Sequence, residues 1–239
     1  MKLVVVTAGL TQPSSTRLLA DRLAAATGRR LGGTAETPVV GTPVVETPVV
    51  ETPVVELRDL AVDIANTFVT GFAGARLRTA LQAVTEADGL IAVTPVFTAS
   101  YSGLFKSFFD VLDNTALVGK PVLIAATGGT ARHSLVLEHA LRPLFAYLRA
   151  VVAPTAVYAA SEDWGGGGDA SADSLSGRVA RAGAELADLM RARAPYLAER
   201  TPPPATHATT GGDGGGERLG ETSAEEVVPF AEYLASLRP

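Results

Sequence analysis

Three short stretches of hydroxyl residues and glycine carry most of the chemistry that this sequence offers. They lie at residues 8–16, 94–103 and 127–133, and each follows a run of apolar residues. Hydroxyls and free backbone amides can hold a phosphate, and glycine lets the backbone approach a ligand closely. None of the stretches is strongly charged. Together they suit a ligand with a phosphate, a polyol and a flat ring system.

The first stretch, Ala8–Thr16, has a glycine, a proline and four hydroxyl residues in nine positions. A helix is expected to begin near its end, because apolar residues then recur at helical spacing. Those residues are Leu19, Leu23 and Ala26. A hydroxyl of Ser14, Ser15 or Thr16 can cap this helix. The helix N-terminus is then either a phosphate site or simply a capped helix without a ligand.

The second stretch, Thr94–Asp110, follows the apolar run Gly89–Val93. It turns at Pro95, exposes an aromatic residue and a cluster of hydroxyls, and resumes as an amphipathic helix. An aromatic residue at the carboxyl end of a buried strand suits a planar ligand in an open α/β sheet, and the proline stiffens the loop. An ordinary strand-to-helix connection is the alternative.

Five apolar runs predict five buried strands that alternate with helices. The runs are Lys2–Thr7, Val54–Leu57, Gly89–Val93, Gly119–Thr127 and Val151–Ala160. This alternation predicts an α/β fold, a doubly wound five-stranded parallel sheet of flavodoxin-like order 2-1-3-4-5. In such a sheet the loops after the strands gather at the carboxyl edge, which would bring the three stretches together.

The expected helices follow from apolar periodicity. They span Ala75–Ala87, Ser134–Ala150 with an interruption at Pro143, and Asp173–Ala194. Residues Leu57–Ile64 are expected to leave the sheet, and Asn66–Gly74 to form a loop.

The domain organisation predicted from the sequence has one domain, residues 1–200, followed by two smaller segments. A Pro-Val-Val repeat at residues 36–55 has proline at every fifth position, which forbids a helix or a central strand, so it is expected to be an insertion. Residues 201–222, rich in proline and glycine, are expected to be a linker. Residues 223–239 are expected to form a C-terminal helix or tail.

Composition excludes several classes of protein. A net charge of −5 over 239 residues and a pI near 5.3 argue against nucleic-acid binding. The absence of cysteine excludes disulfides and thiol chemistry, and the three histidines show no metal-ligand spacing. No signal segment precedes the first strand, and no apolar stretch reaches membrane-spanning length, so we expect a cytoplasmic protein without a membrane partner.

Two nucleotide-binding motifs are missing from the first strand-to-helix turn. It has neither the Gly-x-Gly-x-x-Gly of dinucleotide-binding domains nor the Gly-x-x-x-x-Gly-Lys-Ser/Thr of P-loop proteins. Among phosphate-bearing ligands with a flat ring, FMN is then the best chemical fit.

These stretches resemble the flavodoxin-like NADPH-dependent FMN reductases, and in particular the branch that accompanies luciferase-like flavin-dependent monooxygenases. The matching segments are Val4–Leu10 with Pro13–Leu19, Thr94–Lys106, and Ala125–His133. The resemblance implies hydride transfer from NADPH (or NADH) to FMN, and delivery of reduced FMN to a partner monooxygenase. It also implies a homodimer or homotetramer.

The resemblance further implies a role for individual residues. The FMN phosphate would be held by Thr11, Ser15 and Thr16. The isoalloxazine ring would be bordered by Pro95, Val96, Phe97 and Thr98, with Ser100 and Tyr101 beside them. The far edge of the ring would be lined by Thr127, Gly128 and Gly129. NADPH would meet Arg132 and His133, or these two would only form a solvated helix N-terminus. No catalytic side chain and no metal are expected, because the cofactor carries the hydride chemistry.

Three further residues and three other functions are alternatives. Lys106 is either a site lysine or a structural one, His139 is expected to be a packing or interface residue, and Trp164 either covers the flavin or packs elsewhere. The competing functions are a quinone or azo reductase that keeps FMN bound, a flavodoxin-type electron carrier, and a scaffold on a degenerate fold.

Overall fold

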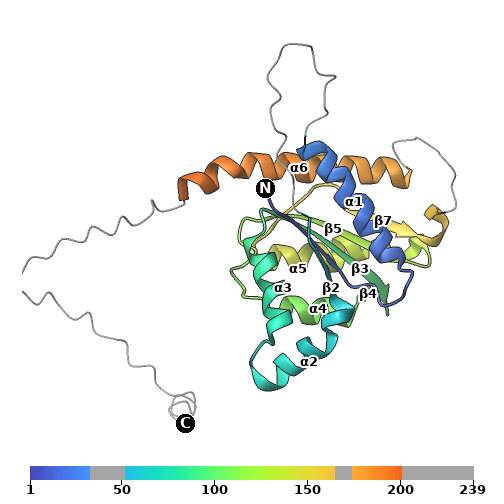
Figure 1. Ribbon diagram of the computed structural model, residues 1–239. Helices are drawn as coiled ribbons and strands as arrows, with labels where there is room; N and C mark the ends of the chain where they lie inside the picture. Colours follow the sequence, from blue (N-terminus) through green and yellow to red (C-terminus); the bar gives the residue numbers. More distant parts are fainter. Residues whose placement is uncertain (33–51, 165–173, 201–239) are drawn as a thin grey trace, which may run out of the picture. The chain divides into compact units, whose positions relative to one another are not determined.

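A parallel β-sheet with helices on both faces organises the residues that the structure describes (Figure 1). The computed structural model describes residues 1–32, 52–164 and 174–200. All of them belong to one compact unit, Met1–Thr201. The α/β class expected from the alternating apolar runs is confirmed.

The sheet has the order β2-β1-β3-β5, with β6 and β7 both paired to the outer edge of β5. These strands are parallel, and the short β4 pairs antiparallel with β3. The strands are β1 (Leu3–Thr7), β2 (Val54–Glu56), β3 (Gly89–Phe97), β4 (Ser100–Tyr101), β5 (Pro121–Gly128), β6 (Val151–Val152) and β7 (Val157–Ala160).

The prediction of five strands was wrong in two details. The fifth strand is divided into β6 and β7, because Pro154 lies between them and cannot donate to the ladder. The other detail is β4, which was not predicted. It forms because β3 continues through Pro95 to Phe97 and the chain then folds back on itself.

Six α-helices flank the sheet in the described residues. They are α1 (Ser15–Leu31), α2 (Ala61–Thr70), α3 (Ala75–Glu86), α4 (Gly103–Asp110), α5 (Arg142–Tyr147) and α6 (Leu175–Arg200). Short turns precede or join them: η1 (Leu57–Leu60), η2 (Ala131–His133), the π-helical η3 (Leu137–Leu141) and η4 (Ser161–Trp164). Figure 1 shows α1 and α6 on one face of the sheet and α3, α4 and α5 on the other.

Each face of the sheet has its own hydrophobic core. Leu3 and Val5 of β1 pack in the cluster with α1 and α6, while Val4 and Val6 pack in the cluster with α3, α4 and α5. Successive residues of a strand point to opposite faces, so a strand covered on both faces must be apolar throughout. The unbroken apolar run at the N-terminus therefore follows from the position of β1 inside the sheet.

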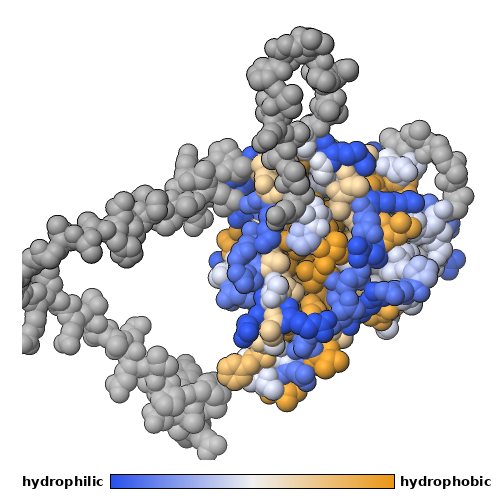
Figure 2. All heavy atoms as spheres, in the orientation of Figure 1, coloured by the Kyte–Doolittle hydropathy of each residue, from blue (hydrophilic) through white to orange (hydrophobic). Residues whose placement is uncertain are grey.

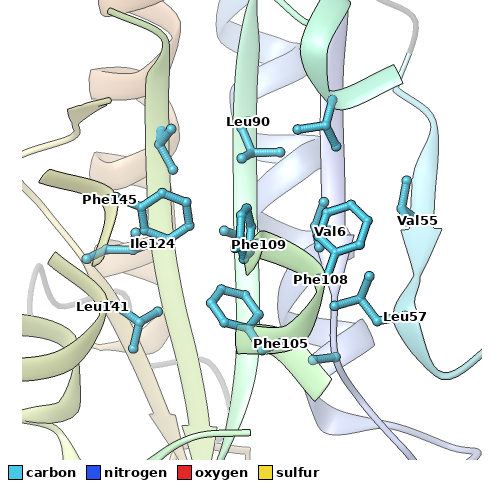
Figure 3. Close-up of a cluster of buried hydrophobic side chains, with 14 of the residues drawn as sticks. Val6, Val55, Leu57, Leu90, Phe105, Phe108, Phe109, Ile124, Leu141 and Phe145 are labelled. Carbon is cyan, nitrogen blue, oxygen red and sulfur yellow. The ribbon is translucent and has the colours of Figure 1, made fainter. Parts of the chain in front are cut away.

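Aromatic residues of α4 anchor that helix to the sheet. Phe105 and Phe109 have ring centroids 4.8 Å apart, and Phe109 meets Phe145 of α5 edge-on at 5.0 Å. Figure 3 shows these rings against Leu90 and Ile124 of the sheet. Because α4 is fixed in this way, the loop that precedes it is held at the carboxyl edge.

The loop predicted for Asn66–Gly74 is instead helical as far as Thr70. The hydroxyls of Thr67 and Thr70 donate to the carbonyls four residues before them. Gly71, with φ of 75°, then ends α2 in the left-handed conformation. The loop is thus reduced to four residues, 71–74.

Several predicted segments lie wholly or partly outside the described residues. Only the last copy of the Pro-Val-Val repeat is described, and it forms β2 as expected. The predicted linker at 201–222 and tail at 223–239 lie outside. Among the helices that the structure describes, none combines the length and the apolar character that a bilayer crossing requires.

Candidate functional site

The loops after β1, β3 and β5 meet around a cleft of about 240 Å³ at the carboxyl edge of the sheet. Nine of the twelve residues predicted to contact the cofactor line it. They are Thr11, Ser15, Thr16, Pro95, Val96, Phe97, Thr127, Gly128 and Gly129. Leu10 and Ser14 also line it, although no contact was predicted for them. The structure thus brings the three stretches together.

One end of the cleft is the N-terminus of α1. The hydroxyl of Ser14 caps the helix by accepting from the amide of Arg17 at 3.2 Å. Ser15 and Thr16 fill the first two helical positions, where the helix itself supplies no acceptor for the amides. Gly9 is needed beneath them, because a Cβ at this position would lie 2.1 Å from the hydroxyl of Ser14. This end of the cleft suits a phosphate-binding site, because it offers free amides, hydroxyls and the positive end of the helix dipole.

A buried hydrogen bond links the first loop to the end of β5. The hydroxyls of Thr16 and Thr127 lie 2.8 Å apart, and the two residues are only 3% and 4% exposed. Either hydroxyl can be the donor. This bond fixes the separation between the helix N-terminus and the glycines that follow β5.

The second wall of the cleft is the hairpin of β3 and β4. Pro95, Val96 and Phe97 face the cleft, and Phe97 is 46% exposed. The hairpin turns at Thr98 and Ala99, whose φ angles are 49° and 65°. Tight hairpin turns require such angles, but residues other than glycine rarely adopt them, so this wall carries backbone strain.

The other three predicted contacts lie outside the cleft. Thr98 occupies the turn, and Ser100 lines a neighbouring groove. Tyr101 packs towards Phe105, with ring centroids 6.1 Å apart. These residues lie outside the cleft because the chain folds back onto β3 and forms the unpredicted strand β4.

The third wall is the end of β5, where glycine is required by a neighbouring tyrosine. A Cβ on Gly128 would lie 2.0 Å from the hydroxyl of Tyr158. That hydroxyl donates to the carbonyl of Thr130 at 2.9 Å, which orders the loop. Burial, and then the negative charge of Asp163, raise the pKa of Tyr158, so the phenol stays protonated and neutral beside the cleft.

A second groove, of about 370 Å³, adjoins the hairpin on its other side. Arg132 and His133, predicted to meet NADPH, line it together with Ser100 and His139. His139 was expected to be a packing or interface residue. It lies six positions after His133, which would place the two on different faces of one α-helix. His133 instead ends a 3₁₀ turn and His139 lies in a π-helix, and both line the same groove.

Lys106 and Trp164 lie outside the cleft. Lys106 forms an ion pair with Asp110 one turn along α4. Trp164 lies under the guanidinium of Arg22, 4.9 Å from it, and borders other hollows.

The donors around the cleft fit FMN. Backbone amides and hydroxyls lie at one end of the cleft, and apolar side chains lie at the other. At the glycines after β5 the ligand can come close to the backbone, because no side chain intervenes. In the part of the chain that the structure describes, no group of three or more His, Asp or Glu residues is placed to hold a metal ion.

Comparisons with known proteins identify the family of the chain. The sequence model of the family described as NADPH-dependent FMN reductase matches residues 1–165. An FMN reductase (NADPH) of Pseudomonas aeruginosa is 38% identical over 163 residues, which are 68% of this chain and 78% of that protein. An NADH-dependent FMN reductase of Pseudomonas fluorescens is 51% identical over 90 residues, 38% of this chain and 48% of that protein.

A solved structure supports the same assignment. An oxidoreductase from Corynebacterium diphtheriae superposes with a TM-score of 0.70 and 43% sequence identity, covering 80% of this chain and 97% of that one. The chain therefore belongs to the NADPH-dependent FMN reductase family, and is an oxidoreductase that uses FMN and NAD(P)H.

Proposed function

We propose that the cleft is the FMN site of this reductase. The observation that carries the proposal is the meeting of three loops, from strands far apart in the sequence, around one cleft. The phosphate would lie at the N-terminus of α1, against Thr11, Ser15 and Thr16. The ring would lie between the hairpin wall and the glycines that follow β5.

The neighbouring groove would receive the nicotinamide donor. It borders the same β3–β4 hairpin that forms one wall of the cleft, so the donor would approach the ring from the side of Ser100. Arg132 offers a guanidinium fork of the kind that binds phosphate. His133 and His139 add ring nitrogens as hydrogen-bond partners, and Leu135 and Val136 add apolar side chains to the lining.

The side chains act mainly by placing the reactants. FMN and the nicotinamide donor supply the hydride chemistry between them when both are bound. The hydroxyls of Ser15 and Thr16 hold one end of the flavin, and the bond from Thr16 to Thr127 keeps that end at a fixed distance from the ring wall. Val96 and Phe97 would cover one side of the ring. Tyr158 holds its proton and keeps the loop after β5 in place.

We further propose that reduced FMN leaves the cleft for a partner monooxygenase of the luciferase-like class. The support is the resemblance to the branch with such partners, together with a cleft wall that remains exposed at Phe97. A stopped-flow measurement of FMNH₂ release tests it. Release slower than NADPH turnover would show that FMN stays bound, as in a quinone reductase.

We also propose that the enzyme is a homodimer or homotetramer that assembles through α2. Three large apolar residues of this helix, Val62, Phe68 and Val69, are exposed, and so is Phe72 just after it. Figure 2 shows hydrophobic side chains at the lower end of the molecule, where α2 lies. Several large exposed apolar side chains on one short segment are typical of an interface. Light scattering on Phe68→Glu should show a monomer, whereas an unchanged mass would exclude this surface.

The experiment that tests the main proposal is NADPH oxidation under air by the purified protein, with and without added FMN. Turnover that depends on FMN supports it. No turnover with any flavin would overturn the proposal. A stable yellow protein that does not react with NADPH or NADH would indicate an electron carrier.

A further inference from the structure

The loop between β1 and α1, residues 8–14, would hold the phosphate in the proposed flavin site, and we call it the phosphate loop. The ladder of β1 supports it as far as Ala8, whose amide donates to the carbonyl of Val93 at 3.0 Å. Residues 10–13, which follow, are all exposed. The hydroxyl of Thr11 donates to the carbonyl of Pro13 at 3.1 Å, but that bond only links the loop to itself. A binding loop keeps a fixed geometry when other parts of the fold support it.

Arg58, from the turn that follows β2, contacts the tip of the phosphate loop. Its Nη1 donates to the carbonyl of Thr11, 47 positions earlier in the chain, at 3.4 Å. The carboxamide oxygen of Gln12, turned towards the arginine, accepts from Nη1 at 3.0 Å and also from Nη2. Two consecutive residues of the loop are thereby bound by one planar guanidinium, whose donors have a fixed relative geometry.

The side chain of Arg58 is itself held in place. Leu57 and Leu60, on either side of it in η1, are 0% and 7% exposed and belong to the core cluster with α3, α4 and α5. Nε of Arg58 lies 3.7 Å from a carboxylate oxygen of Glu56 and 3.5 Å from one of Asp59. The buried backbone of η1 and the two carboxylates therefore fix this side chain at both of its ends.

We propose that Arg58 is a positioning residue that keeps the phosphate loop in its FMN-binding conformation, and so lets the enzyme select FMN over riboflavin. Arg58 does not line the flavin cleft, and two carboxylates already offset its charge. It therefore acts through Thr11 and Gln12, without touching the phosphate. This inference rests on the proposed position of the FMN phosphate.

The ring end of the flavin site is independent of this contact. Arg58 and Gln12 line a groove beside the N-terminus of α1. Of the described residues, those lining this groove include Thr11 and Ser15, but none from the β3–β4 hairpin or from the loop after β5. Loss of the contact would move the residues that meet the phosphate and leave both walls that face the ring in place. The affinity for a flavin with a phosphate should then fall, while the affinity for a flavin without one should not.

The test compares the Kd of FMN with that of riboflavin in Arg58→Ala. The Kd of FMN should rise about tenfold, because the variant removes hydrogen bonds that a charged donor makes. The Kd of riboflavin should stay within about twofold, since the ring walls keep their contacts. Quenching of flavin fluorescence measures both constants in the absence of a nicotinamide donor. A fold defect that extended beyond the loop would instead raise both constants.

Two further variants isolate the contact. Arg76→Ala is the matched control, because Arg76 also donates to a backbone carbonyl, that of Asp59 at 3.0 Å, which lies in η1 and not in the phosphate loop. It should change neither constant. Gln12→Ala removes one partner of Arg58 without changing any charge, so it should raise the Kd of FMN about threefold and leave that of riboflavin unchanged.

Salt dependence separates positioning from attraction through the solvent. The Kd of FMN in Arg58→Ala is divided by that of the wild-type protein at low and at high salt. This ratio should be the same at about 50 mM and about 500 mM NaCl, because direct hydrogen bonds are screened far less than a charge that acts over a distance.

Each contrary outcome is distinct. An unchanged Kd of FMN in Arg58→Ala would overturn the proposal, and so would an equal loss of FMN and riboflavin. A ratio that falls to about one at high salt would also overturn it, since Arg58 would then act by its charge alone. A wild-type protein that binds FMN no more tightly than riboflavin would instead overturn the phosphate assignment, and with it that part of the proposed function.

Discussion

The two ends of the sheet are built from opposite kinds of side chains. At the carboxyl end, the cleft is lined by hydroxyls, glycines and apolar residues, and its hairpin carries two residues with positive φ. At the amino end, charged groups are paired and backbone carbonyls are satisfied. Lys120 is only 2% exposed, and its ammonium donates to the carbonyls of Val84 and Thr85 at 2.5 and 2.8 Å. These hydrogen bonds satisfy carbonyls in the last turn of α3.

Lys2 completes the amino end of the sheet. Its amide donates to Asp88 at 2.8 Å, and its ammonium lies 3.1 Å from Glu86. This comparison teaches that stability and ligand binding are separated along the strand direction. Substitutions at the amino end should change the free energy of unfolding, and those at the carboxyl end should change flavin affinity.

The largest effect is expected at Lys120. Lys120→Ala should lower the free energy of unfolding by about 3 kcal/mol, since it leaves a cavity and two buried carbonyls without a donor. Denaturant unfolding measures this, and the Kd of FMN should stay within about twofold. Lys106→Ala, at an exposed lysine of α4, is the control and should cost less than about 0.5 kcal/mol. A large loss of FMN affinity in Lys120→Ala would break the separation.

At Ser15 we expect a loss of FMN affinity without a loss of stability. Ser15→Asp should weaken FMN binding by about 2 kcal/mol, roughly 30-fold, because a carboxylate would repel the phosphate at close range. The melting temperature should hold or rise, since a negative charge suits a helix N-terminus. Ser15→Ala separates repulsion from the loss of a hydroxyl, and should weaken binding only by about 1 kcal/mol. Unchanged affinity in Ser15→Asp would remove the phosphate assignment.

Between pH 8 and pH 10 the pH dependence of stability should report on the amino end of the sheet. Burial is the main cause that lowers the pKa of Lys120 to about 8, from 10.5. Between these two values the unfolded chain holds more protons than the folded one, so the stability attached to Lys120 is lost as the pH falls through 8. Stability should therefore rise by about 2 kcal/mol between pH 8 and pH 10.

Above pH 10 the raised pKa of Tyr158 acts in the opposite direction, because the unfolded chain then loses a proton that the folded chain keeps. Urea titrations at several pH values measure the curve. Lys120→Met should flatten the rise between pH 8 and pH 10, and a rise that persists in this variant would assign it to another group.

The smallest change in the free energy of unfolding is expected where a substitution relieves backbone strain at the hairpin turn. Ala99→Gly should stabilise the protein by about 1 kcal/mol, because glycine adopts a φ of 65° without cost. Arg149→Gly, at a φ of 58° near the amino end, is the matched variant and should stabilise by a similar amount. Only Ala99→Gly should alter turnover, since only that turn forms a wall of the cleft. Equal turnover in both would show that the strain has no role in the reaction.

The carboxyl end could be predicted from the sequence to a large extent. Apolar runs followed by hydroxyls and glycine are local signals, and a doubly wound sheet brings the ends of its strands together whatever the intervening sequence. The packing of Leu19 and Leu23 against the sheet was predicted for the same reason, because helical periodicity is local.

The remaining features depend on contacts between distant residues or on unusual geometry. The local sequence does not predict that β4 folds back on β3, so the packing of Tyr101 towards Phe105 could not be foreseen. The shared groove of His133 and His139 requires a π-helix, which α-helical spacing does not anticipate. Lys120 lies beside a proline in an apolar run, and its partners are backbone carbonyls 35 and 36 residues away.

The bond between Thr16 and Thr127 has a consequence for how the site responds to charge. Because either oxygen can donate, the pair has two polarities that differ only by rotation of the hydroxyl hydrogens. An anion at the helix N-terminus selects the state in which Thr16 points its hydrogen outwards and Thr127 supplies the inner one. The two hydroxyl dipoles would then share one orientation, without displacement of any heavy atom. A change of ligand charge at the helix N-terminus would then alter the hydrogen-bond polarity at the end of β5 through the rotation of two hydroxyl hydrogens.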